Sequence, residues 1–483
     1  MAGGKLVTES TPLVNKGARK DQEGEQWPPT YTCVMAMCAS LNSVNLGYDM
    51  SVNSGVSVLI QRQWSLSSWQ VGWYMGSLIF IEGAGALLNA WLVDFLGRRK
   101  ALAAAQVLFV LGVVLSATAA DFLHLMMGRI GVGLGIGISM AIDPLYVAEI
   151  APADHRGLLS TLPELGLNLG ILLGFASNRL LLPLPDDVNW RVMLALGLVL
   201  PLILLVLALF ILPESPRWLL LHSRREEAAD VLRRTHATGT DIQPVVDGLA
   251  KQAEEATSSG GWTDLFRALA TPGSTRQQLV TAIGIAIAQQ ATGEPSVLLF
   301  SPRIFDAAGA VPLQEELMLT MLLGIVKTAA VLVAALLIDN VGRRPLLVGS
   351  TSAMALFYVT LAVGIWLQIR LLTIFSVMLF MAAFSIGMGP LCWLLMSEFC
   401  PLAFRGKGTA VAVFSNRIVG AIISTTFLPL SDTLTSAGYF ACFAGITAAI
   451  AVVFACTIPE TKRLTLEQIG DESHRQYVGN HAA

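Results

Sequence analysis

Long apolar stretches alternate with short polar ones along nearly the whole chain of 483 residues. Each apolar stretch is about 20 residues long, the length that a helix needs to cross the hydrocarbon core of a bilayer. We predict twelve such stretches, which begin near Tyr31, Gln70, Ala101, Phe122, Leu158, Trp190, Gln277, Leu317, Leu346, Leu371, Gly408 and Gly438. The alternating pattern of a transmembrane β-barrel is not visible. The sequence therefore predicts an all-α membrane protein with twelve transmembrane helices.

The composition supports the same class. Charged residues make up 13% of the chain, whereas a soluble domain carries about 25%. The six cysteines lie in or at the ends of apolar stretches and lack the spacing of metal ligands. No basic stripe, nucleophile motif or phosphate-binding loop is visible. We therefore expect no metal, cofactor, nucleic-acid partner or enzymatic activity, and expect the lipid bilayer and a small solute as partners.

Basic residues predict the orientation. They concentrate in alternate loops, and the positive-inside rule places those loops and both termini in the cytoplasm. The first 28 residues are polar, so we expect the first span to act as its own targeting signal. The predicted organisation is a tail over 1–28, a six-helix domain over 29–213, a cytoplasmic helical connector over 214–275, a six-helix domain over 276–459 and a tail over 460–483.

The second half of the chain repeats three motifs of the first half in the same order. PESPR at 213–217 is echoed by PETKR at 459–463, 246 residues later. The other two repeats pair Asp94, Arg98 and Arg99 with Asp339, Arg343 and Arg344, 245 residues apart, and Glu149 and Arg156 with Glu398 and Arg405, 249 apart. Two six-helix pseudo-repeats are typical of transporters whose site lies between the halves.

The repeated charges are expected to form a cytoplasmic gate. An aspartate at a helix end can accept from the N-terminus of a helix or from an arginine of a neighbouring helix. We expect these ten charged residues to latch the two halves together when the cytoplasmic side is closed. The alternative is that the arginines serve only to orient the chain in the membrane.

Several motifs resemble the sugar porter family of the major facilitator superfamily. They are GRR after the second and eighth spans, PESPRWL, QQATG and PETK, and the match runs from about Tyr31 to Leu466. PLYVAEIAP, SPRIFDAAG and AFSIGMGPLCW most resemble plant-type polyol and monosaccharide–proton symporters. The resemblance implies the major facilitator fold, alternating access, and a sugar or sugar alcohol as substrate.

The resemblance also implies a central substrate site. Its residues carry amides, which both donate to and accept from hydroxyl groups, and an indole that can cover an apolar sugar face. The matching positions are Glu164, Asn168, Gln289, Gln290, Ser385, Trp393, Asn416 and Lys327. For each amide the alternative is a hydrogen bond between helices.

The chain departs from the family pattern at a few acids. After QQATG, Glu294 and Pro295 replace an apolar residue followed by Asn or Asp. Glu82 and Asp143 stand where small or apolar residues are expected, and Lys327 is a candidate to neutralise one of the acids. These departures leave open an altered substrate or partial loss of transport.

Asp49 is the single charge in the first span, and Arg129 at the start of the fourth span is its candidate partner. Four alternate glycines from Gly131 to Gly137 would allow close helix packing there. Ionisable residues inside a membrane are usually functional. The resemblance implies that the same two residues couple transport to protons, and the alternative is a permanent structural ion pair.

The sequence thus predicts proton-coupled symport of a monosaccharide or sugar alcohol. The alternatives are a facilitative carrier without proton coupling and, from another class, a sugar sensor that does not transport. We expect the plasma membrane as the location. The ESTPLV segment at Glu9–Val14 resembles an acidic dileucine signal and keeps a vacuolar or endosomal membrane as the alternative.

Overall fold

The computed structural model describes most of the chain, without the side chains of residues 252–257, 339 and 405. The described ranges are 29–152, 159, 161–236, 241–257, 261–307, 309, 312–401 and 404–460. The ESTPLV segment and Arg156 therefore lie outside the described residues.

The first half consists of six membrane-crossing units. Two units are broken into shorter helices, namely α4 with α5 and α8 with α9. The helices are α1 (Thr30–Trp64), α2 (Ser68–Leu96), α3 (Arg98–Ala117), α4 (Phe122–Ser139), α5 (Ile142–Ile150), α7 (Leu162–Leu180), α8 (Asn189–Leu196) and α9 (Val199–Phe210).

A connector of four short helices follows, and then six more units. The connector helices are α10 (Pro216–Leu221), α11 (Arg225–Thr235), α12 (Gln243–Thr257) and α13 (Trp262–Ala270). The second half comprises α14 (Ser274–Ala291), α15 (Glu294–Leu299), α16 (Ser301–Asp306), α17 (Leu313–Val341), α18 (Arg343–Trp366), α19 (Arg370–Ile386), α20 (Met388–Phe399), α21 (Arg405–Leu434) and α22 (Ser436–Thr457).

These helices confirm the predicted all-α, twelve-span fold. Each unit begins within four residues of the start that hydrophobicity predicts; the largest differences are at α7, which begins at Leu162, and α17, which begins at Leu313. Nine stretches of the described chain are long and apolar enough to cross a membrane. The other three units are α1, α7 and α14–α16, which contain buried polar side chains such as Asp49, Asn168 and Gln289.

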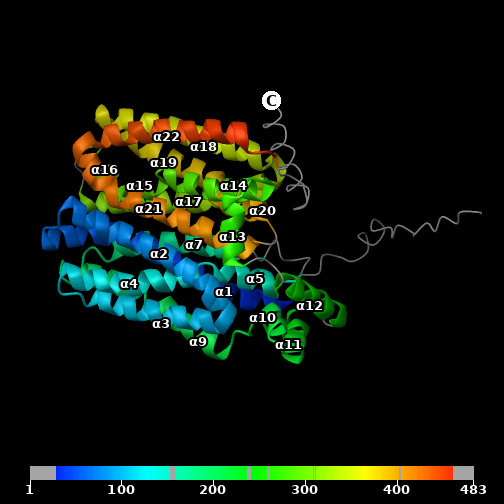
Figure 1. Ribbon diagram of the computed structural model, residues 1–483. Helices are drawn as coiled ribbons and strands as arrows, with labels where there is room; N and C mark the ends of the chain where they lie inside the picture. Colours follow the sequence, from blue (N-terminus) through cyan, green and yellow to red (C-terminus); the bar gives the residue numbers. More distant parts are fainter. Residues whose placement is uncertain are drawn as a thin grey trace, which may run out of the picture.

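The two halves lie side by side, the first half blue to cyan and the second mostly yellow to red (Figure 1). They meet chiefly where α2 packs against α21 and α7 against α17. The connector helices α10–α12 lie at the end of the molecule where α1 begins (Figure 1). There the hydroxyl of Thr32 on α1 donates to the carbonyl of Thr235 on α11 at 2.7 Å. We call this end the connector side and the opposite end the far side.

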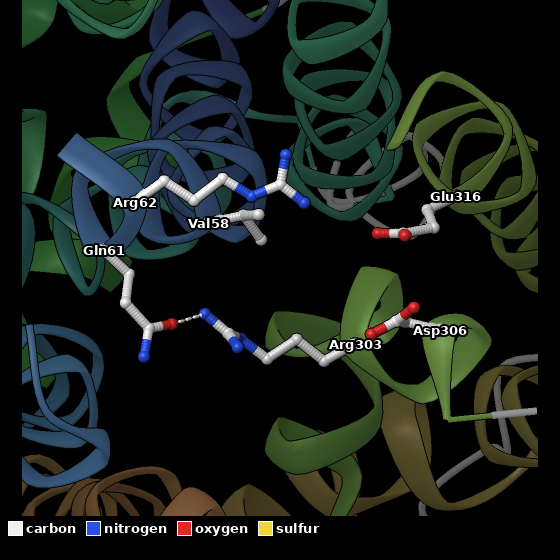
Figure 2. Close-up of a pocket in the computed structure, with 6 residues that line it drawn as sticks. All are labelled: Val58, Gln61, Arg62, Arg303, Asp306 and Glu316. Carbon is white, nitrogen blue, oxygen red and sulfur yellow. Dashed lines mark hydrogen bonds between the residues drawn. The ribbon is translucent and has the colours of Figure 1, made fainter. Parts of the chain in front are cut away.

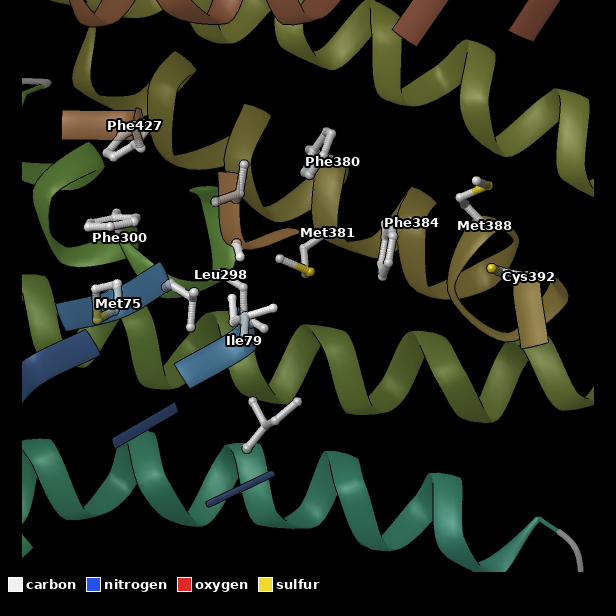
Figure 3. Close-up of a cluster of buried hydrophobic side chains, with 14 of the residues drawn as sticks. Met75, Ile79, Leu298, Phe300, Phe380, Met381, Phe384, Met388, Cys392 and Phe427 are labelled. Carbon is white, nitrogen blue, oxygen red and sulfur yellow. The ribbon is translucent and has the colours of Figure 1, made fainter. Parts of the chain in front are cut away.

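Apolar side chains fill the second half (Figure 3). Phe300, Phe380, Phe427 and Met381 are buried in one continuous cluster. The Phe300 and Phe427 rings lie 4.6 Å apart, which joins the end of α15 to α21. Such packing holds the broken unit α14–α16 against its neighbours, although α15 and α16 have only six residues each.

The glycines of α4 bring that helix close to α2, as the sequence predicts for this run. A methyl group placed on Gly137 would lie 2.2 Å from the carbonyl oxygen of Glu82, and one on Gly133 would lie 2.8 Å from the side chain of Ile81. Only glycine allows this approach of the two backbones. The consequence is that Arg129, near the start of α4, reaches the residues of α1 and α2.

Candidate functional site

Asp49 belongs to a buried polar cluster in the first half. Asn53 lies one turn after it on α1, Tyr74 comes from α2 and Arg129 from α4, and all four are buried. Arg129 Nη1 donates to Asn53 Oδ1 at 2.9 Å, and the Tyr74 hydroxyl donates to the same oxygen. The Arg129 guanidinium also lies 3.9 Å from the centre of the Tyr74 ring. The Asn53 amide donates to the Asp49 carbonyl at 2.5 Å and to its carboxylate at 3.4 Å.

The two predicted partners are thus joined through Asn53. Within the described part of the chain, Asp49 and Arg129 make no direct ion pair. Asn53 is a residue that sequence reasoning missed, although its position four residues after Asp49 places it on the same helical face. A change in the charge of Asp49 would alter the hydrogen bonds of Asn53 and, through them, the position of Arg129.

Two predicted amides of the second half hydrogen-bond to each other. Asn416 on α21 donates to Gln289 Oε1 on α14 at 2.9 Å and to the carbonyl of Ala286 at 2.7 Å. Gln289 in turn donates to the carbonyl of Gly389 at 3.1 Å, at the start of α20. This network holds three helices of one half together. Gln290 is buried and lies close to α21: a methyl group placed on Gly420 of α21 would lie only 2.7 Å from its Oε1.

The predicted residues of α7 lie against α17 of the other half. Asn168 donates to the carbonyl of Glu164 at 2.8 Å and to its carboxylate at 3.2 Å. The hydroxyl of Thr328, next to Lys327, lies 3.5 Å from the carbonyl of Asn168. Lys327 lies 5.1 Å from the centre of the Phe384 ring on α19. The structure therefore brings Glu164 and Asn168 on α7 of the first half next to the segment of α17 in the second half that carries Lys327.

Two of the three acids that depart from the family pattern, Glu294 and Glu82, form ion pairs with long separations. Lys327 Nζ is 3.8 Å from Glu294 Oε1, within the second half. Arg417 Nη1 is 3.4 Å from Glu82 Oε2, which joins α21 to α2 and so joins the two halves. Arg417 also lies 5.8 Å from the centre of the ring of Trp393, a partly buried side chain. Arg417 was missed in the sequence, although it directly follows Asn416.

Several of these residues have a buried polar atom without a partner. Ser385 Oγ, Asn168 Oδ1 and Asn416 Oδ1 make no hydrogen bond within the described chain. Glu82 Oε1 and Arg417 Nε, which the ion pair between the halves leaves free, make none either. Unsatisfied buried groups are costly, and the hydroxyl groups of a bound ligand could satisfy them. Acceptors and donors are both present, so the region suits a neutral ligand with many hydroxyl groups.

A cavity of about 260 Å³ lies between the halves on the far side. Gln61 and Arg62 at the end of α1 face Arg303 and Asp306 on α16 and Glu316 on α17 (Figure 2). Arg303 donates to Gln61 Oε1, so one hydrogen bond spans the two halves here. The cavity is lined by two cationic and two acidic side chains, so its lining carries no net charge when all four are ionised.

Predicted gate residues on the connector side pair within each half. Arg98 on α3 donates from Nε and Nη2 to both carboxylate oxygens of Glu149 on α5, each at 2.9 Å. In the second half Arg343 Nε lies 3.9 Å from Glu398 Oε1. Both pairs join helices of the same half. We call these two contacts within the halves the latches, and the expected latch between the halves stays a prediction.

The repeated glutamates of PESPR and PETKR cap helices. Glu214 accepts from the backbone N–H of Arg98 at 2.8 Å and of Arg99 at 3.2 Å, at the start of α3. Glu460 accepts in the same way from Arg343 at 2.9 Å and Arg344 at 3.2 Å, at the start of α18. The internal repeat thus extends to side-chain contacts, because a carboxylate is favourable at a helix N-terminus.

The remaining gate residues behave differently from the prediction. Arg99 donates to the carbonyls of Ala208 and Leu209, and Arg344 to that of Ala455, so both hold helix ends. The Asp94 side chain is exposed and makes no hydrogen bond within the described residues; Glu149 and Glu214 take the roles expected of it. Arg156 and the side chains of Asp339 and Arg405 lie outside the described part.

The fold and the buried polar site between its halves define a class of protein, the two-fold symmetric membrane transporter. The family model described as "Sugar (and other) transporter" matches residues 35–472 of the chain. "Polyol transporter 5" of Arabidopsis thaliana is 36% identical over 467 residues, covering 91% of this chain and 86% of that protein. The arabinose-proton symporter of Escherichia coli (strain K12) is 31% identical over 445 residues, covering 90% and 92%.

Solved structures agree with these sequence matches. The inward-open xylose transporter XylE of E. coli has a TM-score of 0.78 at 25% identity, covering 91% of this chain and 99% of that one. XylE bound to 6-bromo-6-deoxy-D-glucose, described as a major facilitator superfamily proton:xylose symporter, has a TM-score of 0.77 at 26% identity, covering 92% and 99%. The chain belongs to the sugar transporter family and has the major facilitator fold. It is a multi-pass membrane transporter and not an enzyme, as the sequence predicts.

Proposed function

We propose that the protein moves a monosaccharide or sugar alcohol together with a proton across a membrane by alternating access. The single observation that carries the proposal is the pair of buried polar clusters. One contains Asp49 and Arg129, and the other lies between the halves around Arg417. The names of the relatives, which include polyol transporters and an arabinose-proton symporter, support the same substrate class.

The substrate site is proposed to use the predicted amides and the ion pair between the halves. Asn168, Gln289, Gln290 and Asn416 offer donors and acceptors to hydroxyl groups, and Trp393 covers an apolar face of the sugar. Glu164, Ser385 and Lys327 complete the predicted set. We add Glu82 and Arg417, whose unpartnered atoms can accept from and donate to hydroxyl groups of the substrate.

Proton coupling is proposed to act through Asn53. An ionised Asp49 accepts from the Asn53 amide, whereas a protonated Asp49 is a poorer acceptor and offers a donor of its own. Asn53 also holds Arg129 and Tyr74, so the proton changes contacts among α1, α2 and α4 at once. Such differential contacts in the two protonation states are what coupling requires.

Alternating access is proposed to close the far side through Gln61 and Arg303, which join the two halves. On the connector side, the two latches, Arg98–Glu149 and Arg343–Glu398, are proposed to fix the helix ends of each half that come together when that side closes. The halves are proposed to be residues 29–213 and 276–459, linked by the connector. Both termini and the connector side are assigned to the cytoplasm, from the distribution of basic residues. The plasma membrane is the proposed location, with a vacuolar or endosomal membrane as the alternative.

Asp49→Asn tests the coupling. We expect the variant to exchange labelled substrate across proteoliposomes at close to the wild-type rate, because the amide fills the same space. We expect it to lose accumulation driven by an imposed pH gradient, because the proton-binding group is gone. A panel of hexoses, pentoses and polyols competing for uptake at acidic and neutral pH identifies the substrate beforehand.

The outcomes separate the alternatives. A variant that still concentrates substrate shows that Asp49 is not the coupling residue. A wild-type protein that equilibrates substrate without regard to the pH gradient is a facilitative carrier. A wild-type protein that binds a sugar but exchanges none is a sensor. Asp186→Asn, an exposed acid in the loop before α8, is the matched control.

A further inference from the structure

Asp143 is a buried acid that the proposed mechanism has not used. It lies at the start of α5, is only 1% exposed, and stands where an apolar or small residue is expected in this family. Its Oδ2 accepts from Asn42 at 3.0 Å and from Ser43 at 2.8 Å, both on α1. Asn42 is itself held by Gln106 of α3 at 2.8 Å. These contacts are neutral, and none of the ion pairs of the described chain includes Asp143.

The second oxygen of Asp143 and one guanidinium nitrogen of Arg98 both lack a hydrogen bond within the described chain. These two atoms, Asp143 Oδ1 and Arg98 Nη1, are both buried. Both residues line the same narrow hollow between α1, α3 and α5, together with Ala39 and Tyr146. The hollow therefore contains an unused acceptor and an unused donor, and each belongs to a group that carries charge.

Other charged and titratable groups around the hollow are already engaged. Arg99 donates to backbone carbonyls, and Glu214 accepts from the start of α3. Tyr146 donates to the carbonyl of Pro213 at 2.8 Å. Cys38 of α1 is partly buried and carries no charge as a thiol. Among the described residues that line the hollow, Arg98 is thus the buried cation with an unpartnered buried donor.

An ionised carboxylate without a cation is costly in such a place. Two changes would avoid this cost: Asp143 can be protonated, or it can form an ion pair with Arg98. Arg98 is at present bound to Glu149, which lies six residues further along the same helix. That separation is about 9 Å along the helix axis, so a change of partner requires the Arg98 side chain to adopt a different rotamer.

We propose that Asp143 is a second proton-binding carboxylate and that Arg98 changes partner between Glu149 and Asp143 as this proton comes and goes. When Asp143 holds the proton, Arg98 stays with Glu149 and the latch of the first half is closed. When the proton leaves to the connector side, the Asp143 carboxylate accepts from Arg98 Nη1 and the contact with Glu149 weakens. Proton release on that side is thereby linked to opening of the latch. The inference rests on the proposed proton-coupled transport.

Infrared difference spectroscopy of the purified protein during a pH titration tests proton binding directly. We expect the wild-type protein and Asp49→Asn to share a carbonyl band of a protonated carboxylic acid that disappears as the pH rises. Asp143→Asn should lack this band, and the exposed control Asp186→Asn should keep it. Arg98→Met should keep the band to the alkaline end of the titration, because the cation that stabilises the carboxylate is gone.

The proposal is overturned if Asp143→Asn retains every carboxylic acid band of the wild type, or if the band follows sodium concentration and not pH. It is also overturned if Arg98→Met titrates like the wild type. Asp143→Glu keeps the carboxyl group and serves if the asparagine variant does not fold. Because the spectrum reports proton binding without transport, its failure is distinct from failure of proton-driven uptake, which is measured separately on the wild-type protein.

Discussion

The ion pair between Glu82 and Arg417 is the contact through which the structure ties the two halves together at the centre of the molecule. Glu82 is fully buried and Arg417 is 7% exposed, so neither charge is well solvated. At their separation of 3.4 Å and an effective dielectric constant of about 20, two unit charges attract by about 5 kcal/mol. Part of that attraction only offsets the loss of hydration of both groups.

Removal of one partner of the ion pair should therefore lower the free energy of unfolding far more than removal of both. Arg417→Met leaves Glu82 buried without a cation, and breaking such a pair costs about 3–5 kcal/mol of unfolding free energy. Glu82→Gln leaves Arg417 unpaired and should also be destabilising. The double variant removes both charges, and we expect it to be within about 1 kcal/mol of the wild type, because a buried pair replaced by neutral groups is often neutral in effect.

Reversible unfolding in mixed detergent micelles, followed by tryptophan fluorescence, measures all three variants in one double-mutant cycle. Arg370→Met is the matched control, since it breaks the partly exposed pair with Glu315 on the far side. A solvated pair contributes at most about 1 kcal/mol. If both central single variants cost no more than this control, or if the double variant costs the sum of the two, our account of the central pair is refuted.

Three further changes have outcomes that follow from single contacts. Glu214→Gln removes the charge that caps α3 and should cost about 0.5–2 kcal/mol in the same unfolding assay; a wild-type value would show that the cap contributes nothing. Gly170→Ala places a methyl group 1.9 Å from the carbonyl of Val44 and should cost about 1–3 kcal/mol of unfolding free energy, whereas Gly284→Ala, inside α14 and with nothing within 4 Å of the new methyl group, should be neutral or slightly stabilising. Arg303→Met removes the hydrogen bond to Gln61 and should raise the rate at which Glu316→Cys reacts with a membrane-impermeant thiol reagent; an unchanged rate would argue against a far-side gate.

Part of the site could be predicted because its residues belong to the motifs of the family resemblance and of the internal repeat. Gln289 and its contact Asn416 were both predicted, as were Arg98 and Glu149. Asn53 and Arg417 were missed, although each lies close in sequence to a predicted residue. Adjacent positions on a helix point in different directions, so the sequence does not say which of them faces a neighbour.

The sequence by itself determined the twelve spans, the internal repeat and the family of this protein. Hydrophobic length and repeated motifs are local or periodic properties, and the bilayer permits few structures for such a chain. The tertiary structure decided which charges pair. It placed Asn53 between Asp49 and Arg129, gave the expected roles of Asp94 to Glu149 and Glu214, and joined Glu82 to Arg417 across 335 positions of the chain. Such pairs depend on the distances between packed helices, and the sequence of a single span does not determine those distances.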